Sequence, residues 1–594
     1  MTPDRISKEG SYDSFDNGKV LFGKKKGHLP AMGWNSWNAF GSGNNEKLTR
    51  TIADLICKLG LKDLGYEFVV LDDGCYKPER VDGRLANENV KFPSGFSKLS
   101  DYIHKKGLKF GMYNDIGTNL CAGAAVGTCG HEKEDAESYL GWGVDFLKVD
   151  NCYYPFDNAT FSLYENARFT FAPNIRSIKV DGKKLIATKD GLLTGKGAKR
   201  VNVSRKDKKT GRKINDRHVT RIGTFDGTGC RYSPVGEMSG ELVLEVKSSA
   251  DRNAAIEIEY ATGQRERVGE WLQLAVGNEM FYDDLLPATT SENDYVFSDP
   301  IKIKLKKGIN RIRIMNHRRQ ENTLNSYARL LKWLNKLDPD NDIIYSACEW
   351  GKTQPQNWAY KVCDSWRILN DITFRVGSDG DPGYGSWESD YTCSVTSQYN
   401  KAVIMDSFAG LDKGWNDPDM LMIGMKGLNL TQNKTHMAMW CMMNAPLMLG
   451  LDLRRVKKGD ALHKIIANKD LISINQDPLG VQAKRIYCSL AASKSDKTYV
   501  RDIDRVDILA KPMTDGKAAI SFINVSGTDK KDGWKIYIKD IARIFKKYGL
   551  TPGEFELSDV WSGKVSKIKN GVIEVNSLKA YENKTYILTP VKKR

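Results

Sequence analysis

The stretch GVDFLKVDNCYYP, residues 143–155, places an amine and a carboxylate at the end of an otherwise apolar segment. Phe146 and Val149 favour a buried strand, yet Lys148 and Asp150 come at its far end. A buried strand that ends in ionisable groups is typical of barrel enzymes, whose active sites lie at the carboxyl ends of the strands. We therefore expect chemistry at this strand end.

Similar polar and aromatic side chains stand at the ends of other apolar runs. The full set is Trp37, Asp72, Asp73, Tyr113, Lys148, Asp150, Glu349, Arg367, Asp371 and Asp419. Acids dominate it, no Ser-His-Asp arrangement is indicated, and none of the seven histidines falls on a predicted strand end.

Two chemistries fit these residue types. A pair of carboxylates that flank a bond can hydrolyse a glycoside, one as the nucleophile and the other as the proton donor. A carboxylate cluster can instead hold Mg²⁺ or Mn²⁺. Lys148 and Arg367 would compete with a metal ion for the same carboxylates, so the composition favours sugar chemistry.

The elements that position these residues follow two rhythms. Strand-like and helix-like segments alternate from about residue 33 to 151, which indicates parallel βα units. Between about 157 and 323 the pattern becomes period two with Gly, Asp and Asn turns, which indicates a β-sandwich. We expect an α/β protein with an N-terminal extension over 1–29, a (β/α)₈ TIM barrel over 30–156 and 325–482, an inserted jelly-roll-like β-sandwich over 157–324, and a C-terminal antiparallel β-sandwich domain over 483–594.

Composition limits the classes of partner. The net charge is +16, but residues 176–221 alone hold 16 Lys/Arg against 4 Asp/Glu, so most of the excess belongs to one module. That stretch lacks the aromatic side chains on which bases stack, and we expect a solvated face rather than a nucleic-acid site. No apolar run is long enough to span a membrane, and no signal peptide is visible.

Eight motifs occur in an order that resembles the α-galactosidases of glycoside hydrolase family 27, in clan D. They are MGWNSWNAF, LDD, KFGMYNDIGTNLCAG, FLKVDNC, YSACEWG, SWRILNDI, GWNDPDML and INQDPLG. The resemblance covers roughly residues 30–155 and 325–480. It implies hydrolysis of terminal α-D-galactosyl residues from oligosaccharides or glycans, with retention of configuration and without a cofactor.

The same resemblance assigns the catalytic pair. It implies that Asp150 is the nucleophile, with Lys148 contacting the sugar hydroxyls. It also implies that Asp371 is the acid/base, one helical-type turn after Arg367. An ammonium close to Asp150 would favour its ionised form. In a retaining enzyme the two carboxyl groups lie about 5–5.5 Å apart.

Further positions match the family's sugar-binding residues. Asp72 and Asp73 match the acids that bind O4 and O6 of galactose, and paired acids can reject the wrong epimer. Trp37 matches the floor of the sugar site, Tyr113 a hydroxyl contact and Asp419 an acid beside the ring. The loop Cys348-Glu349-Trp350 matches the surroundings of O2. The large Glu349 and Trp350 disfavour the relatives' N-acetylgalactosaminide substrates.

Two cysteine pairs also follow from the resemblance, Cys121 with Cys152 and Cys348 with Cys363. An oxidised first pair would favour an oxidising compartment. The compartment, the oligomeric state and the natural aglycone stay open.

The chain departs from the family pattern in two places. Gly74 and Cys75 stand where relatives carry a Cys and a large aromatic, which leaves open a β-L-arabinopyranosidase with an altered O6 rim. The insertion resembles carbohydrate-binding modules, and the alternative is a spacer or dimer surface. Trp271 and Tyr282 are candidate stacking platforms, and the alternative for both is packing in the core. The residues also leave open an α-N-acetylgalactosaminidase, a non-catalytic sugar-binding protein, and a structural calcium ion in the insertion, which no residue pattern indicates.

Overall fold

The computed structural model describes residues 27–153, 173–194, 198–206, 210–211, 213–222, 241–262, 273–276, 279–281, 286–287, 289–315, 318–389, 394–491, 499–568 and 570–591. Most of the predicted extension, together with Trp271 and Tyr282, lies outside these residues. The chain divides into two compact units, one formed by the inserted segment up to residue 325 and the other by the segments on either side of it.

The second unit holds eight strands that pair in parallel. In spatial order they are β21 (Trp415–Asp417), β18 (Ser365–Arg367), β17 (Ile344–Cys348), β4 (Phe146–Asp150), β3 (Lys109–Asp115), β2 (Phe68–Val70), β1 (Met32–Asn35) and β22 (Leu447–Leu449). The ring closes through a parallel bridge between Leu421, which follows β21, and Leu449 of β22. These pairings confirm the predicted (β/α)₈ barrel.

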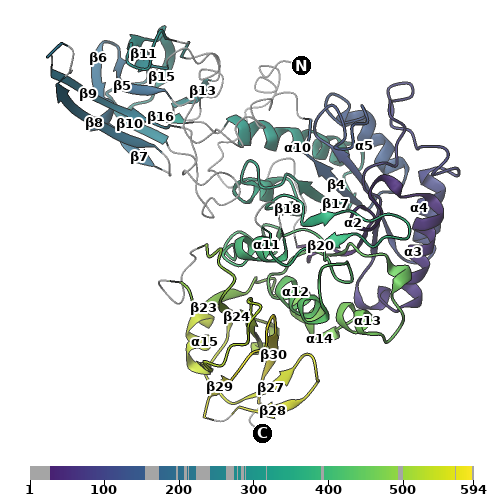
Figure 1. Cartoon of the computed structure of the whole chain (residues 1–594). Coiled ribbons are helices and arrows are strands. Elements are labelled where there is room, and N and C mark those ends of the chain that lie inside the picture. The colour runs from purple at the N-terminus through teal and green to yellow at the C-terminus, as the bar shows by residue number, and fades with distance from the viewer. Residues whose placement is uncertain are drawn as a thin grey trace. The chain divides into compact units, whose positions relative to one another are not determined.

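Helices follow the strands as the sequence rhythm predicts. They are α2 (Trp37–Phe40), α3 (Glu46–Lys58), α4 (Phe96–His104), α5 (Glu132–Gly141), α10 (Arg318–Leu337), α11 (Val395–Ala402), α12 (Leu430–Met442), α13 (Ala461–Ile466) and α14 (Lys469–Asn475). Asn45 caps α3 by accepting the amide of Leu48, and the apolar stripe of α3 then buries Ile52 and Ile56. Such packing holds each strand end in place. Figure 1 shows α3, α4 and α5 along one side of the barrel.

The C-terminal segment is the predicted antiparallel β domain. One sheet has the order β23 (Lys484–Cys488), β24 (Val506–Pro512), β25 (Ala518–Asn524), β30 (Asn583–Pro590), β27 (Phe555–Asp559) and β28 (Val565–Lys567). A second layer pairs β26 (Trp534–Tyr537) with β29 (Val572–Val575), next to helix α15 (Ile538–Ile544), over a shared apolar core.

The C-terminal domain and the barrel belong to the same compact unit. Buried polar bonds explain why. Lys511 of β24 donates to Asn444 and to the carbonyl of Ile474, and the indole of Trp387 donates to the carbonyl of Val525.

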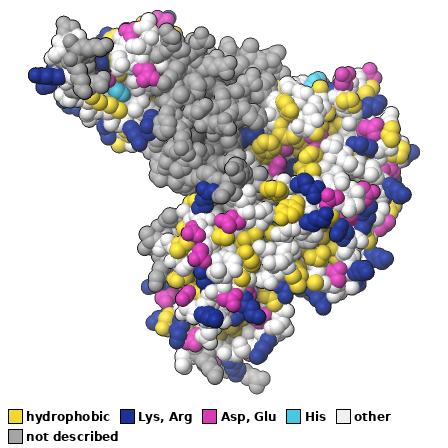
Figure 2. Space-filling view, viewed as in Figure 1, with side chains coloured by type: hydrophobic (Ala, Val, Ile, Leu, Met, Phe, Trp, Pro, Cys, Tyr) yellow, Lys and Arg dark blue, Asp and Glu magenta, His cyan; other side chains and the backbone are white. Residues whose placement is uncertain are grey.

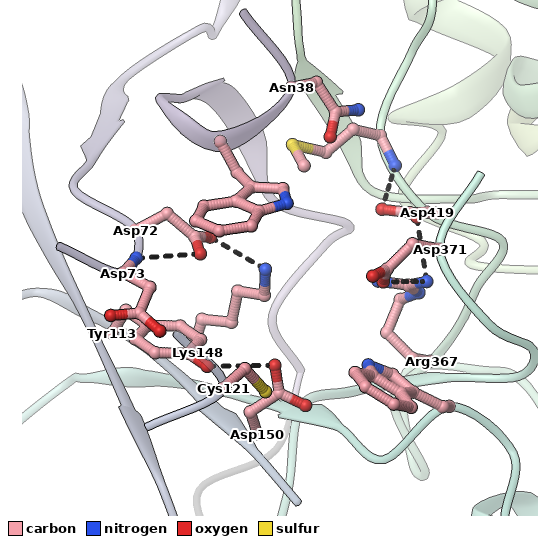
Figure 3. A pocket seen from close by; sticks show the side chains of 13 residues that line it. Asn38, Asp72, Asp73, Tyr113, Cys121, Lys148, Asp150, Arg367, Asp371 and Asp419 are labelled. Carbon is pink, nitrogen blue, oxygen red and sulfur yellow. Dashed lines mark hydrogen bonds and ion pairs between the residues drawn. The ribbon is translucent and has the colours of Figure 1, made fainter. Parts of the chain in front are cut away.

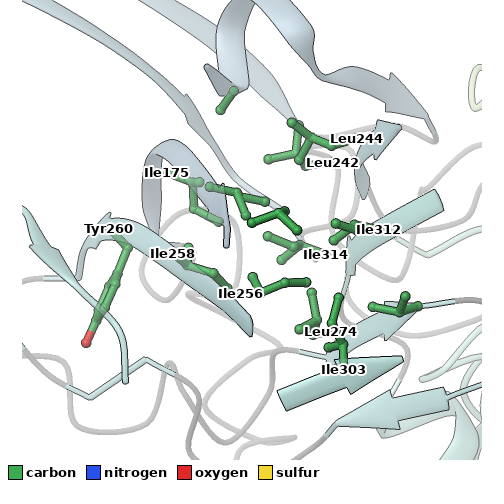
Figure 4. Close-up of a cluster of buried hydrophobic side chains, with 14 of the residues drawn as sticks. Ile175, Leu242, Leu244, Ile256, Ile258, Tyr260, Leu274, Ile303, Ile312 and Ile314 are labelled. Carbon is green, nitrogen blue, oxygen red and sulfur yellow. The ribbon is translucent and has the colours of Figure 1, made fainter. Parts of the chain in front are cut away.

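The inserted unit is a β-sandwich of two antiparallel sheets. One has the order β13 (Glu279–Phe281), β12 (Gln273–Val276), β16 (Gly308–Met315), β10 (Glu241–Ser248) and β7 (Leu192–Thr194). The other has the order β14 (Val296–Phe297), β11 (Arg252–Ala261), β5 (Asn174–Val180), β9 (Lys213–Thr220) and β8 (Lys199–Lys206). Two further strands pair with inner strands of this sheet: β15 (Ile301–Leu305) pairs with β11, and β6 (Lys183–Ile186) pairs with β5. Aliphatic side chains from both sheets, such as Ile256 and Ile314, form its core (Figure 4).

The surface charges and the helices are where a nucleic-acid patch or a membrane span would show. In Figure 2, basic and acidic side chains are interspersed over the visible face of the described residues. No helix among the described residues has the length and apolar character needed to cross a membrane.

Candidate active site

Side chains from the ends of the barrel strands converge on one pocket. It encloses about 350 Å³, part of it open to solvent. Its lining is Trp37, Asn38, Asp72, Asp73, Tyr113, Cys121, Lys148, Asp150, Trp350, Arg367, Asp371, Asp419 and Met420, most of which are labelled in Figure 3. Eleven of these thirteen residues were predicted from the sequence.

Three predicted residues do not line the pocket. Cys152 is joined to the lining residue Cys121, and Cys348 is buried behind Arg367, with its sulfur 3.6 Å from Nη1. Glu349 is fully buried and accepts the amide of Thr353, so it supports its own loop. The chain turns after β17, where Trp350 adopts φ +60°, so neighbours in the motif CEWG point in different directions.

Asp150 is one of the buried carboxylates of the pocket. It ends β4 and is 5% exposed. Its Oδ2 accepts the hydroxyl of Tyr113 at 3.1 Å, and its Oδ1 accepts the amide of Asn151 at 3.0 Å. These bonds fix the orientation of the carboxylate at the end of its strand.

The electrostatic balance at Asp150 differs from the prediction. Burial raises the pKa of Asp150 to about 6, and this outweighs the lowering by Lys148. The ammonium of Lys148 is engaged elsewhere, because its Nζ donates to Oδ2 of Asp72 at 2.7 Å. The negative charge of Asp371 adds to the rise in the pKa of Asp150.

Asp371 is the accessible carboxylate of the pocket, with 44% of its side chain exposed. The spacing of four residues from Arg367 suggests a helical turn, but Asp371 lies in the loop after β18. Nη2 of the buried Arg367 lies 3.1 Å from Oδ1 of Asp371 and 2.8 Å from Oδ2 of Asp419. One guanidinium therefore holds two carboxylates on the same side of the pocket (Figure 3).

The opposite wall presents the pair Asp72 and Asp73. Oδ2 of Asp72 accepts from Lys148 and, at 2.8 Å, from Asn35. The two oxygens of Asp73 accept the amides of Gly74 and Ala122 at 2.6 and 2.7 Å. Oδ2 of Asp72 already accepts two bonds, but its Oδ1 and both oxygens of Asp73 each accept only one, so both acids can still accept hydroxyl groups of a ligand.

The departure at Gly74 and Cys75 has a steric origin. Gly74 adopts φ +94°, and a Cβ there would lie within 3 Å of Ser42. Cys75 is fully buried. Neither residue lines the pocket, so this departure does not directly narrow the space around the ligand.

The predicted bond between Cys121 and Cys152 is present, with Cα atoms 5.3 Å apart, and it links the loops after β3 and β4. Cys348 and Cys363 are both thiols. Among the described residues, Asp115, Cys121, Asp150 and Cys152 bring donor atoms within 4.8 Å of one another, a spacing that suits a metal ion. Because the two sulfurs are joined to each other, they are not available as thiolate ligands.

Sequence reasoning missed several residues. Asn38 and Met420 line the pocket, and each is the direct neighbour of a predicted residue or motif position. Asp115 accepts the amide of Cys152, and Lys352 donates to the carbonyl of Asn151, so both contact the main chain directly after Asp150. Asp115 stands in the quoted motif KFGMYNDIGTNLCAG, so its acid at a strand end was a usable signal.

Comparison with known proteins agrees with this geometry. The profile of the family described as alpha galactosidase A matches residues 29–183 and 309–477, and most of the insertion lies between the two matched ranges. An alpha-galactosidase of Cyamopsis tetragonoloba is 25% identical over 567 residues, covering 95% of this chain and 87% of that protein.

Two solved structures share the fold. An alpha-galactosidase from Saccharomyces cerevisiae with raffinose is 20% identical with a TM-score of 0.58, covering 95% of this chain and 98% of that one. A GH27 β-L-arabinopyranosidase from Geobacillus stearothermophilus is 15% identical with a TM-score of 0.54, covering 95% and 97%. At these identities the likeness concerns the fold alone.

Proposed function

The chain belongs to the alpha galactosidase A family, and from that premise we propose that it is a retaining exo-α-galactosidase. It hydrolyses terminal non-reducing α-D-galactosyl residues of oligosaccharides or glycoconjugates. The observation that carries the mechanism is the pairing of a buried and an exposed carboxylate, Asp150 and Asp371, in the lining of one pocket.

In the first step, Asp150 attacks the anomeric carbon while Asp371 gives its proton to the glycosidic oxygen. The bond from that oxygen to the anomeric carbon breaks, the aglycone leaves, and an ester joins the sugar to Asp150. In the second step, Asp371 takes a proton from water, the water oxygen attacks the anomeric carbon, and the carboxylate of Asp150 is released. Two inversions leave the configuration unchanged.

The burial of the two acids suits these roles. Asp150 is shielded from water, so its ester is protected until Asp371 activates a water molecule. The exposed side chain of Asp371 can exchange protons with solvent between the steps. Arg367 fixes one oxygen of Asp371 and leaves the other oxygen for the proton.

Substrate choice rests on the opposite wall. Asp72 and Asp73 are proposed to accept the O4 and O6 hydroxyls, with Lys148 as a donor beside them. Trp350 lines the pocket and its buried indole N–H has no acceptor among the described residues, so it is available to a sugar hydroxyl. An epimer that left these buried groups unpaired would bind less well.

No cofactor enters the proposed reaction. Lys148 and Arg367 already pair with Asp72, Asp371 and Asp419, and proton transfer and covalent catalysis need only the two acids. Activity that survives dialysis against EDTA supports this part of the proposal, and loss that Mg²⁺, Mn²⁺ or Ca²⁺ restores contradicts it.

The substrate assignment is tested with three aryl glycosides: an α-D-galactoside, an N-acetyl-α-D-galactosaminide and a β-L-arabinopyranoside. We expect a strong preference for the galactoside, because Asp73 can bind an O6 hydroxyl that the arabinoside lacks. A preference for the arabinoside would overturn the named substrate and keep the mechanism. Absence of all three activities would favour a non-catalytic sugar-binding protein.

A further inference from the structure

The peptide bond between Asn151 and Cys152, directly after Asp150, is held at both ends by buried side chains. Nζ of Lys352 donates to the carbonyl oxygen of Asn151 at 2.5 Å. Oδ2 of Asp115 accepts the amide N–H of Cys152 at 2.6 Å. A cation therefore binds the negative end of this peptide dipole, and a buried carboxyl oxygen accepts from its positive end.

The two side chains come from the two neighbours of the nucleophile strand. Asp115 ends β3 and lies in register with Asp150, while Lys352 lies in the loop after β17. Both β3 and β17 pair directly with β4. Asp115 is 0% exposed and Lys352 is 3% exposed, so water does not compete for either bond.

The second oxygen of Asp115 extends this arrangement. Oδ1 accepts the amide of Gly117 at 2.6 Å, so one carboxylate ties the chain after β3 to the chain after β4. In return, the amide of Ile116 donates to the carbonyl of Asp150 at 2.9 Å. The main chain that follows the nucleophile is thus fixed by groups that do not line the pocket.

We propose that Asp115 and Lys352 are positioning residues that hold the two ends of the peptide 151–152 and thereby fix the nucleophile Asp150. This inference rests on the proposed function, in which Asp150 attacks the sugar. Neither residue lines the pocket, so their effect passes through the main chain and through the electric field at Asp150.

The field effect has a definite sign for Lys352. Its positive charge lowers the pKa of Asp150, against the rise that burial causes. Burial and the charge of Asp150 raise the pKa of Asp115 to about 8, so Asp115 contributes through its two hydrogen bonds and not through a fixed negative charge. The ionisable groups around Asp150 are Tyr113 and Asp115 from β3, Lys148 from β4, Tyr327 from α10, Cys348 from β17, Lys352 after β17 and Asp371 after β18.

The test measures kcat and KM for an aryl α-D-galactoside across pH in Lys352→Met, Lys352→Arg and the wild-type protein. For Lys352→Met we expect kcat to fall about 10- to 100-fold through misplacement of Asp150. The acid limb of kcat/KM should move to higher pH, because a cation beside Asp150 is gone. Lys352→Arg should restore the limb, since it returns the charge.

Lys352 also lies over the ring of Trp350, 4.2 Å from its centroid. If that contact were its only role, KM would rise while kcat and the acid limb stayed at wild-type values, and the proposal would be wrong. Lys511→Met is the matched control, because Lys511 is another buried lysine that donates to main-chain carbonyl oxygen, that of Ile474. It should lower stability without moving the limb.

The second arm combines Lys352→Met with Asp115→Asn. Because both residues hold one peptide, the loss of kcat in the double variant should be smaller than the product of the two single losses. Independent, multiplicative losses would contradict a shared peptide. If Asp115→Asn does not fold, the Lys352 series decides by itself. A wild-type protein without galactosidase activity would instead remove the proposed function.

Discussion

The hydroxyl of Tyr113 donates a hydrogen bond of 3.1 Å to Oδ2 of Asp150, so an uncharged, buried donor faces the proposed nucleophile. Burial raises the pKa of Tyr113 well above its ordinary value, and the hydroxyl therefore stays a donor throughout the working range. The same bond would orient the carboxylate for attack on the sugar.

Replacing Tyr113 by Phe removes this donor and leaves the ring. A hydrogen bond to a charged group contributes about 1.5–3 kcal/mol. We therefore expect kcat/KM for an aryl α-D-galactoside to fall roughly 10- to 100-fold. Tyr66→Phe is the control, because its buried hydroxyl donates to the carbonyl of Ile466. Equal losses in both variants would mean that only stability had changed.

The dependence of activity on pH follows from the buried nucleophile. Burial raises the pKa of Asp150 to about 6, and only the ionised form attacks the sugar. We expect kcat/KM to decline as pH falls through about 6, approaching a tenfold loss per unit below it. Rates from pH 3.5 to 8 test this expectation, and a constant value between pH 5 and 7 would contradict it.

The carboxyl group of Asp150 should make the folded protein more stable at low pH, where activity falls. Its pKa in the folded protein lies above its value of 3.8 in the unfolded chain. Its contribution to folding is therefore most favourable below 3.8 and is lost as pH rises through about 6. Replacing Asp150 by Asn should remove this contribution, so the pH dependence of the free energy of unfolding should become flatter over that range.

The disulfide between Cys121 and Cys152 supports the sugar-binding wall. Next to Cys121, the amide of Ala122 donates to Oδ2 of Asp73 at 2.7 Å. Replacing both cysteines by Ser should raise KM more than it lowers kcat. In the chain-entropy estimate, losing a bridge between residues 31 apart also costs about 3–4 kcal/mol of stability.

The control for the cysteine variant is Cys57→Ser, which removes a partly exposed thiol outside the pocket. Measurements of KM and of urea unfolding should leave this control at wild-type values. An unchanged KM in the double variant would show that Asp73 does not depend on the bridge.

Substrates with different leaving groups distinguish the role of Asp371 in the first step from its role in the second. If Asp371 protonates the departing oxygen, Asp371→Ala should slow substrates with poor leaving groups far more than activated aryl galactosides, which need little protonation. Azide should then react with the glycosyl-enzyme and give an α-galactosyl azide. Equal losses for all leaving groups would contradict the acid role of Asp371.

The sequence predicted those parts of the site that depend on one strand end. Lys148 and Asp150 could be placed because the active-site residues of a barrel lie at the carboxyl ends of its buried strands. Asp371 and Arg367 were both found, but the spacing predicts a helical turn between them where the structure has a loop, since a spacing of four also occurs in loops. Glu349 was misplaced because adjacency in a motif does not fix side-chain direction.

Relationships between strands were out of reach of the sequence. Asp115 and Lys352 act on Asp150 because β3 and β17 both pair with β4, although β17 comes almost 200 residues later in the chain. The packing of the C-terminal domain into the barrel unit depends on single buried bonds such as that of Lys511. No periodicity in the sequence encodes such contacts.

The central claim is that Asp150 forms a bond to the sugar, and azide rescue of Asp150→Ala tests it most directly. We expect this variant to lose hydrolysis of an aryl α-D-galactoside and to regain turnover when azide is added. Azide would attack from the face that the carboxylate has vacated, so the product should be β-galactosyl azide. Full activity without azide, or rescue that gives only the α-azide, would contradict the account.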